Sequence, residues 1–164
     1  MPDCPIDLNS LLVSTLFMTP GRMRDLAQSL YEEHYVKVGS HATHDGQPVI
    51  FFRDRFEHAF FRSFNFVAAK GRKNEIDQQR VERIMWIGEL IKGAIPQSEC
   101  LRIPNERAGR PCNRLYIIKS ECYVVWLEPL KSGGWRFSSA YKPLAHQIKG
   151  YRKSGTLIWK HGQK

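Results

Sequence analysis

The sequence predicts an α+β fold, in which helices pack on one face of an antiparallel β-sheet. Two observations lead to this class: helical patterns dominate the earlier part of the chain, and strand patterns dominate its end. The strand patterns are three runs rich in Tyr, Val, Ile, Trp and Phe, at 114–119, 121–128 and 134–141. The Ser-Gly-Gly sequence at 132–134 predicts a tight hairpin turn between the last two runs, because glycine tolerates the positive φ that such turns require.

The third run contains a change of character along one face. Side chains alternate with a period of two, so Trp135, Phe137, Ser139 and Tyr141 are expected on the same face. Two large apolar residues there give way to two hydroxyl groups. This pattern is typical of a core strand that ends in a polar site, and also of a core strand that reaches its solvated end.

A helical hairpin is expected at the N-terminus, with helices over 6–17 and 21–35. Thr19 and Pro20 form a cap-like start for the second helix, whose apolar residues recur at three- and four-residue spacing. Residues 1–34 contain five Asp or Glu and two Arg, and nothing in them indicates catalysis. We therefore expect this hairpin to be an accessory that packs on the rest of the chain.

The later elements are predicted from boundary signals and from hydrophobic patterns. Asp54 is a good N-cap for a helix that carries His58, and Pro96 ends the longest helix. Polar and basic residues over 63–75 predict an exposed loop. The segments expected to be regular are a strand at 48–52, a helix from Asp54, a helix at 76–95, a short helix at 143–151 and a strand at 156–160.

No metal site is predicted. The sequence has four cysteines: Cys4, Cys100, Cys112 and Cys122. They lack the close spacing of zinc or redox motifs, so free thiols in a reducing compartment are the simplest account, with a zinc site built from distant Cys and His as the alternative. His41 and His44 would share a metal only on a helix, and the Gly, Ser and Asp around them favour a loop.

Basic residues dominate the end of the chain. The formal net charge is +9, and residues 129–164 contain eight Lys or Arg and no Asp or Glu. Aromatic residues, among them Trp135, Tyr151 and Trp159, are interleaved with this charge, which suits a polyanion with stackable bases. A solvated basic tail on an ordinary domain is the competing interpretation.

The hydropathy pattern indicates a protein without a membrane anchor. No apolar run approaches the roughly 20 residues needed to span a bilayer. The N-terminus lacks the basic region that opens a signal peptide. We therefore expect a cytoplasmic protein that has no membrane partner.

The long predicted helix carries arginines at unusual positions. At 100° per residue, four isoleucines of the helix at 76–95 fall in one arc, with Arg80 in its middle, Arg83 at its edge and Trp86 nearby. An arginine in a buried stripe needs a partner, because burying an unpaired charge is costly. An internal ion pair, a snorkelling side chain or an anion pocket would each satisfy that need.

His58 lies among apolar residues, next to Ala59 and close to Phe56 and Phe60. In such surroundings a histidine is often a hydrogen-bonded core residue. Histidine is also the natural proton-transfer group near neutral pH, so a catalytic role stays open.

Four stretches, in this order, resemble the phage- and mobile-element-associated barnase–EndoU–colicin–RelE-like nucleases (the PBECR group, with the BECR fold). They are FFRDRFEHAF at 51–60, the pattern D-x-x-R-x-x-R-I-x-W-I at 77–87, YVV at 123–125 and GWRFSSAY at 134–141. The resemblance implies one or two helices on a four-stranded antiparallel sheet, in an RNase domain at 41–164 that follows a helical extension at 1–40. It also implies a metal-independent RNase, and many proteins of the group act as toxins.

By this resemblance, five residues surround one cleft: His58, Arg80, Arg83, Ser139 and Tyr141. The 2′-hydroxyl of RNA would attack the adjacent phosphorus and leave a 2′,3′-cyclic phosphate, with His58 as general base or acid. The two arginines would stabilise charge on the phosphorane, and Ser139 and Tyr141 would orient the phosphate or donate a proton. The expected RNA contacts are Trp86, Lys119, Arg136 and Lys142, with Trp86 either stacking on a base or packing in the core.

Three classes of function are open on these residues. The first is a toxin-like endoribonuclease of a phage, mobile element or defence system, with no metal or cofactor, RNA as substrate and an acidic antitoxin or immunity protein as a partner. The second is a non-catalytic nucleic-acid-binding module, which needs the arginines and not the histidine. The third is a regulatory protein whose basic face binds an acidic partner.

Overall fold

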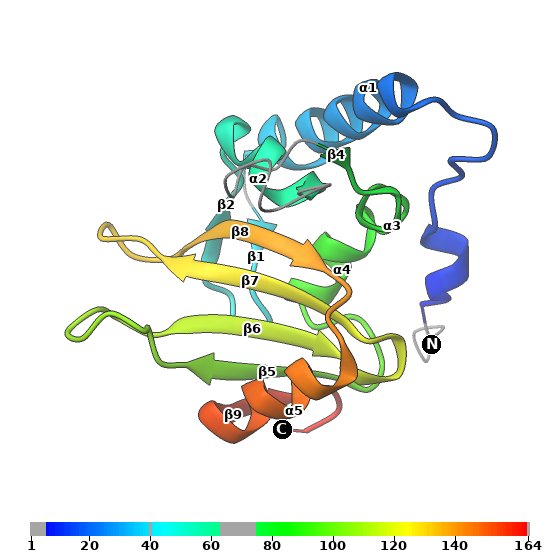
Figure 1. Ribbon diagram of the computed structural model, residues 1–164. Helices are drawn as coiled ribbons and strands as arrows, with labels where there is room; N and C mark the ends of the chain where they lie inside the picture. Colours follow the sequence, from blue (N-terminus) through cyan, green and yellow to red (C-terminus); the bar gives the residue numbers. More distant parts are fainter. Residues whose placement is uncertain (1–5, 40, 63–74, 164) are drawn as a thin grey trace, which may run out of the picture.

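A curled sheet of seven strands forms the centre of the chain, in the order β1-β2-β8-β7-β6-β5-β9 (Figure 1). The computed structural model describes residues 6–39, 41–62 and 75–163, so nearly all of the predicted loop at 63–75 lies outside the described residues. Neighbouring strands are antiparallel except β2 and β8, which run parallel. The strands are β1 (His41–Ala42), β2 (Pro48–Ile50), β5 (Ser98–Ile103), β6 (Asn113–Ile118), β7 (Tyr123–Pro129), β8 (Trp135–Tyr141) and β9 (Thr156–Lys160), with β3 (Phe61–Arg62) and β4 (Glu75–Ile76) paired separately.

The fold class is confirmed as α+β, but the sheet is larger than the four strands expected from the resemblance. The predicted strands at 114–119, 121–128, 134–141 and 156–160 correspond to β6, β7, β8 and β9. Strand β5 was not predicted, because it directly precedes a loop rich in proline and arginine. The short β1 and β2 extend the sheet beyond β8 at the opposite edge.

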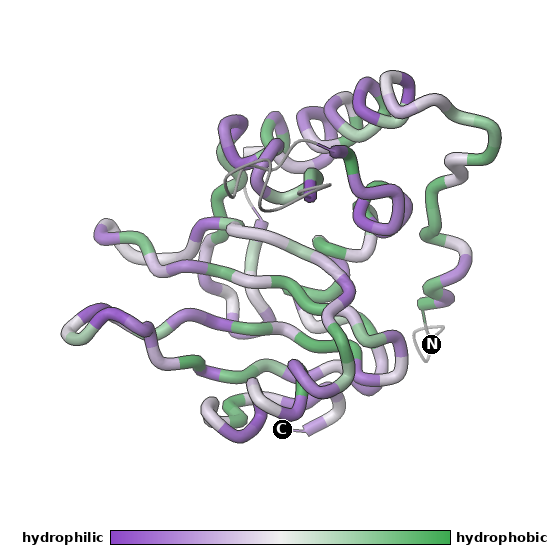
Figure 2. The backbone as a smooth tube through the Cα atoms, in the orientation of Figure 1, coloured by the Kyte–Doolittle hydropathy of each residue, from purple (hydrophilic) through white to green (hydrophobic). Residues whose placement is uncertain are grey.

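Helices cover both faces of the sheet, so the prediction of helices on one face is wrong. One face packs against α1 (Pro20–Tyr31), α2 (Phe56–Phe60), α3 (Gln78–Glu82) and α4 (Trp86–Ile91), and the other against α5 (Ala145–Ser154) (Figure 1). Hydrophobic residues recur along β5 to β8 (Figure 2), and they divide between two buried clusters, one on each side of the sheet. A second small core therefore forms, in which Leu115, Ile117 and Val124 pack with Ile148 of α5.

The predicted N-terminal hairpin is wrong in its first half. Only a short 3-10 turn, η1 (Leu8–Leu11), precedes an irregular segment that leads to α1. In that segment the Val13 N–H donates to the Glu82 carbonyl at 2.9 Å, and the Thr15 hydroxyl donates to the Glu82 carboxylate at 2.9 Å. These bonds hold the segment along α3 and satisfy polar groups that a helix would otherwise pair. The second predicted helix is confirmed as α1, and Thr19 caps it.

The single helix predicted at 76–95 is interrupted between α3 and α4. In the turn between them, the Tyr35 hydroxyl donates to the Ile84 carbonyl at 2.6 Å, and the Tyr123 hydroxyl donates to the Arg83 carbonyl at 3.4 Å. Within the chain the same two carbonyls accept from the N–H groups of Ile87 and Trp86, three residues further on, so the backbone turns more tightly than an α-helix and bends there. The predicted arc of isoleucines is therefore divided: Ile76 lies in β4, Ile84 lies in the turn, and Ile87 and Ile91 lie in α4.

The prediction that Trp135, Phe137, Ser139 and Tyr141 share one face of β8 is wrong, because β8 contains a β-bulge. Leu127 of β7 pairs with Phe137, and the adjacent Trp126 pairs with Ser139, so Ser138 is an extra residue. One inserted residue moves every later side chain to the other face. The α5 side therefore receives Ser139 and Tyr141, and the opposite side keeps Trp135 and Phe137.

The turn between β1 and β2 reaches across the curled sheet to its other edge. The ring of His44 stacks on Trp159 of β9 at a centroid distance of 4.5 Å, and its Nδ1 lies 2.6 Å from the Tyr116 hydroxyl. Burial lowers the pKa of His44 below its ordinary value of 6.5, although Asp45 opposes this shift. Within the described ranges no three His, Cys, Asp or Glu residues are grouped to hold a metal; Cys4 lies outside those ranges.

Candidate active site

An open cleft lies on the α5 side of the sheet. Its volume is about 620 Å³, and it is walled by α2, by β7 and β8, and by the loop that joins β5 to β6. Helix α5 covers another part of this face, where Tyr151 meets Trp126 edge to face at 5.3 Å. The polar residues that line the cleft are His58, Asn105, Glu106, Arg107, Asn113, Glu128, Ser138 and Ser139.

Helix α2 places His58 on the wall of this cleft. Phe56, Ala59 and Phe60 turn into the core, so the helical spacing leaves His58 exposed rather than packed inside. Strand β2 pairs with only the first part of β8, and α2 packs beside β8. The structure therefore brings His58 and Ser139, two of the predicted site residues, to one cleft.

Glu128 is held by a network of hydrogen bonds at the same end of the cleft. Arg136 Nε and the Ser138 hydroxyl each donate to its carboxylate at 2.9 Å. Arg55 donates to Ser138 Oγ at 3.0 Å and lies 3.8 Å from the carboxylate. Burial raises the pKa of Glu128, but the bonds from Arg136 and Ser138 outweigh burial and hold this pKa below its ordinary value. The cleft thus presents an ionised carboxylate with guanidinium groups beside it.

Tyr141 and Arg80 do not line the cleft, but they lie behind Trp126, which does. The indole N–H of Trp126 donates to the Tyr141 hydroxyl at 3.0 Å, and the Arg80 guanidinium lies 5.1 Å from the centre of the Tyr141 ring. Arg80 also donates to the Ala59 carbonyl at 3.1 Å and pairs with Asp77 at 3.3 Å. Of the arrangements that the sequence left open for Arg80, the structure contains the internal ion pair.

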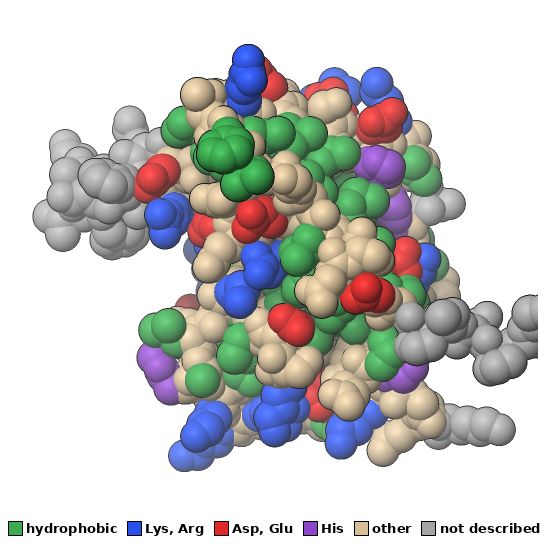
Figure 3. Space-filling model, turned by 90° about the vertical axis from the view of Figure 1, so that its right-hand side faces the viewer, with side chains coloured by type: hydrophobic (Ala, Val, Ile, Leu, Met, Phe, Trp, Pro, Cys, Tyr) green, Lys and Arg blue, Asp and Glu red, His purple; other side chains and the backbone are tan. Residues whose placement is uncertain are grey.

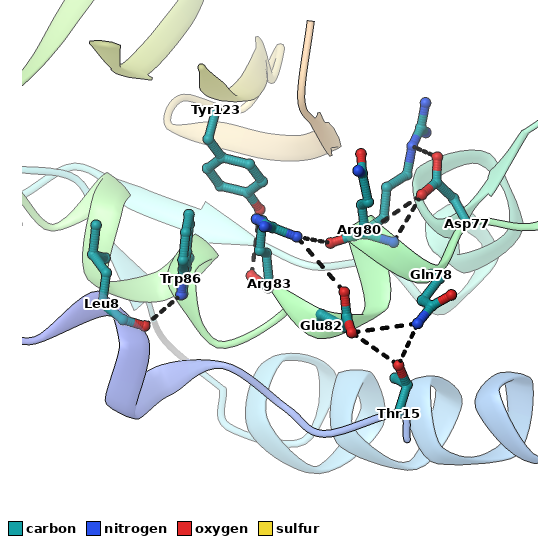
Figure 4. Close-up of polar contacts among 10 residues, drawn as sticks. Leu8, Thr15, Asp77, Gln78, Arg80, Glu82, Arg83, Trp86 and Tyr123 are labelled. Atoms are coloured by element: carbon teal, nitrogen blue, oxygen red, sulfur yellow. Dashed lines mark hydrogen bonds and ion pairs between the residues drawn. The ribbon is translucent and has the colours of Figure 1, made fainter. Parts of the chain in front are cut away.

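Arg83 and Trp86 lie away from the cleft, beside the N-terminal segment (Figure 4). Trp86 is 1% exposed, and its indole N–H donates to the Leu8 carbonyl at 3.1 Å. The Arg83 guanidinium covers the Trp86 ring at 5.1 Å. The expectation that Trp86 stacks on an RNA base is wrong for this structure, because its ring is enclosed by the core. Arg83 does not share a cleft with His58.

The three basic residues expected to contact RNA lie in different places. Arg136 borders the cleft through Glu128, and Lys142 is exposed just after β8. Lys119 is exposed in the turn η4 (Lys119–Glu121), at the end of β6 that is distant from the cleft. Of these three, Arg136 bonds directly to a residue that lines the cleft containing His58.

Arg55, Glu128 and Ser138 were missed by sequence reasoning. A signal existed for Glu128, since counting back from the Ser-Gly-Gly turn pairs it with Arg136 across the hairpin. Ser138 reaches the cleft only through the bulge, which leaves no mark in the hydrophobic pattern. Arg55 resembles an ordinary surface arginine in the sequence, and it occupies the N-cap position of α2 that was predicted for Asp54.

No family model, curated protein or solved structure matches this chain. None of the helices in the described part of the chain is long and apolar enough to cross a membrane.

Proposed function

We propose that this chain is a metal-independent endoribonuclease that cleaves RNA in the cleft. One observation carries the proposal: two proton-transfer groups, His58 and Glu128, line the same cleft, with Arg55 and Arg136 beside the carboxylate. Asn113 supports it, because its buried Oδ1 on the cleft wall has no hydrogen-bond partner among the described residues. A buried acceptor of this kind favours a ligand that brings a donor, such as a nucleobase.

The proposed reaction is a transesterification within the RNA backbone. A base removes the proton of the 2′-hydroxyl, and the 2′-oxygen attacks the adjacent phosphorus. The bond from phosphorus to the 5′-oxygen breaks, and an acid returns a proton to that oxygen. The products are a 2′,3′-cyclic phosphate and a 5′-hydroxyl, so no metal-activated water takes part.

We assign Glu128 as the base and His58 as the acid. In the free protein Arg136 and Arg55 stabilise the Glu128 carboxylate and weaken it as a base. A bound phosphate competes for these guanidiniums, which raises the basicity of Glu128 and places positive charge on the phosphorane oxygens. Ser139 offers a hydroxyl at the cleft wall to orient the phosphate. Tyr141 and Arg80 position Trp126.

The second candidate function is a non-catalytic nucleic-acid-binding module. The observation in its favour is that the Glu128 carboxylate is already engaged by Arg136, Ser138 and Arg55. In a binding module, the role of this carboxylate is to hold the arginines in place for contacts with phosphates. A binding module needs the arginines, whereas a ribonuclease also needs His58.

Incubation of purified protein with single-stranded RNA in EDTA tests the proposal. We expect cleavage to continue, with cyclic phosphate ends identified by mass spectrometry and no cleavage at positions that carry a 2′-deoxyribose. Loss of cleavage on chelation, restored by magnesium, would replace this chemistry with a metal-dependent one. The toxin-like role belongs to the same proposal and predicts growth arrest on expression, relieved by an acidic inhibitor protein.

A further inference from the structure

A second cavity lies at the opposite end of β6 from the cleft. Its volume is about 590 Å³, and it forms where the start of β5, the turn η4, the end of β9 and α5 meet. We call it the distal cavity. Its charged and hydroxyl-bearing lining residues include Glu99, Lys119, Ser120, Arg152, Lys160 and His161.

The distal cavity carries a net positive charge. The Glu99 carboxylate is buried and forms an ion pair with Arg152, so these two charges neutralise each other. Lys119 and Lys160 are exposed, and neither has an ion-pair partner among the described residues. Two ammonium groups therefore face the cavity without a compensating carboxylate, an arrangement that suits an anion such as a phosphate.

Helix α5 connects the two cavities. Its Tyr151 packs on Trp126, which lines the cleft, and the next residue, Arg152, lines the distal cavity. Lys149 and Lys153 are exposed on the same helix, one turn apart. Figure 3 shows Lys and Arg side chains gathered along the lower edge of the face that looks out from the right-hand side of Figure 1.

We propose that the distal cavity binds a backbone phosphate of the same single-stranded RNA whose reacting phosphate lies in the cleft. This inference rests on the proposed function only for the identity of the ligand. From Asn113 in the cleft to Lys119, six residue steps along β6 at about 3.3 Å each span roughly 20 Å. At about 3.4 Å per phosphate in a helical strand, roughly six nucleotides cover that distance, so a dinucleotide cannot reach both cavities.

The test compares long and short RNA on the double variant Lys119→Ala/Lys160→Ala. Binding is measured with an uncleavable 2′-O-methyl RNA of about 12 nucleotides, a length within the usual range of single-strand sites. Losing two phosphate contacts should flatten the slope of log affinity against log salt by about 1.4. If the two proteins bind equally at about 1 M salt, the variant should bind roughly 60-fold more weakly than the wild type at about 50 mM salt. Cleavage of a dinucleotide should keep its wild-type kcat/KM.

The matched control is Arg22→Ala/Lys37→Ala, which removes two exposed charges outside both cavities and should leave the salt slope at its wild-type value. An unchanged salt slope in the Lys119→Ala/Lys160→Ala variant overturns the inference. The inference also fails if the affinity for long RNA and the kcat/KM for the dinucleotide fall by the same factor. If the wild type binds the 12-nucleotide RNA but never cleaves RNA, the proposed ribonuclease function is wrong, and the salt slopes of binding alone decide this inference. Absence of any RNA binding overturns both.

Discussion

Replacing Glu128 with glutamine should destabilise the protein in a pH-dependent way. Glutamine keeps the size of the side chain and the hydrogen bond from Ser138, but it removes the charge that holds Arg136 and Arg55. Because the folded-state pKa of Glu128 lies below its ordinary value of 4.5, the carboxylate contributes stability that is fully present above that value. The contribution is lost as the pH falls through the folded-state pKa.

The expected size follows from the geometry. A hydrogen bond to a charged group contributes about 1.5–3 kcal/mol, and the Glu128 side chain is 30% exposed, so solvent screening reduces that figure. We expect a loss of about 1–2 kcal/mol in the free energy of unfolding at pH 7. For a chain of this length, that loss lowers Tm by about 3–6 °C.

Urea denaturation of wild type and variant at pH 7, 5 and 3 measures this difference. The difference should be largest at pH 7 and should shrink at pH 3, which lies below the ordinary pKa of 4.5, because the unfolded state then binds a proton more readily than the folded carboxylate does. Glu106→Gln is the matched control, because Glu106 lines the same cleft, is exposed and has no ion-pair partner among the described residues. A difference for Glu128→Gln that does not vary with pH, or that equals the control, would refute the network as described.

Two further predictions concern side chains outside the cleft. Trp86→Ala should lower the free energy of unfolding by about 3–5 kcal/mol, because it leaves a large cavity beside Tyr123; a folded variant with weaker RNA binding and unchanged stability would contradict the core assignment. His44 has a lowered pKa, so the unfolded state binds more protons and stability should fall as the pH drops below about 6.5. His44→Gln should flatten that part of the pH profile, and an unchanged profile would show that His44 does not titrate with unfolding.

The strands of the meander were predictable because their pattern is local. Aromatic and β-branched residues between turn signals set β6, β7 and β8 to within a residue or two. The helix predicted at 76–95 is broken by a tighter turn, where Tyr35 and Tyr123, both distant in sequence, donate to the carbonyls of Ile84 and Arg83. Contacts of this kind depend on tertiary structure and have no local signal.

The candidate site could be predicted only in part from the sequence, because its residues are also brought together by tertiary structure. His58 could be placed by helical spacing, since its neighbours on α2 are apolar and turn inward. Ser139 reached the cleft because the bulge at Ser138 changed its face. Arg83 shares the predicted helix with Arg80, but the break after α3 directs it to Trp86 instead.

The most direct test of the central claim compares RNA cleavage by wild type, His58→Ala and His34→Ala in EDTA. His34 is the control because it is exposed and does not line the cleft. If His58 transfers a proton in the cleft, His58→Ala should lower the cleavage rate by about 10²–10⁴-fold. Its affinity for RNA and its circular dichroism spectrum should stay unchanged, and His34→Ala should cleave RNA at the wild-type rate. A folded His58→Ala variant that cleaves at the wild-type rate, or a wild type that leaves the RNA intact, would contradict the account.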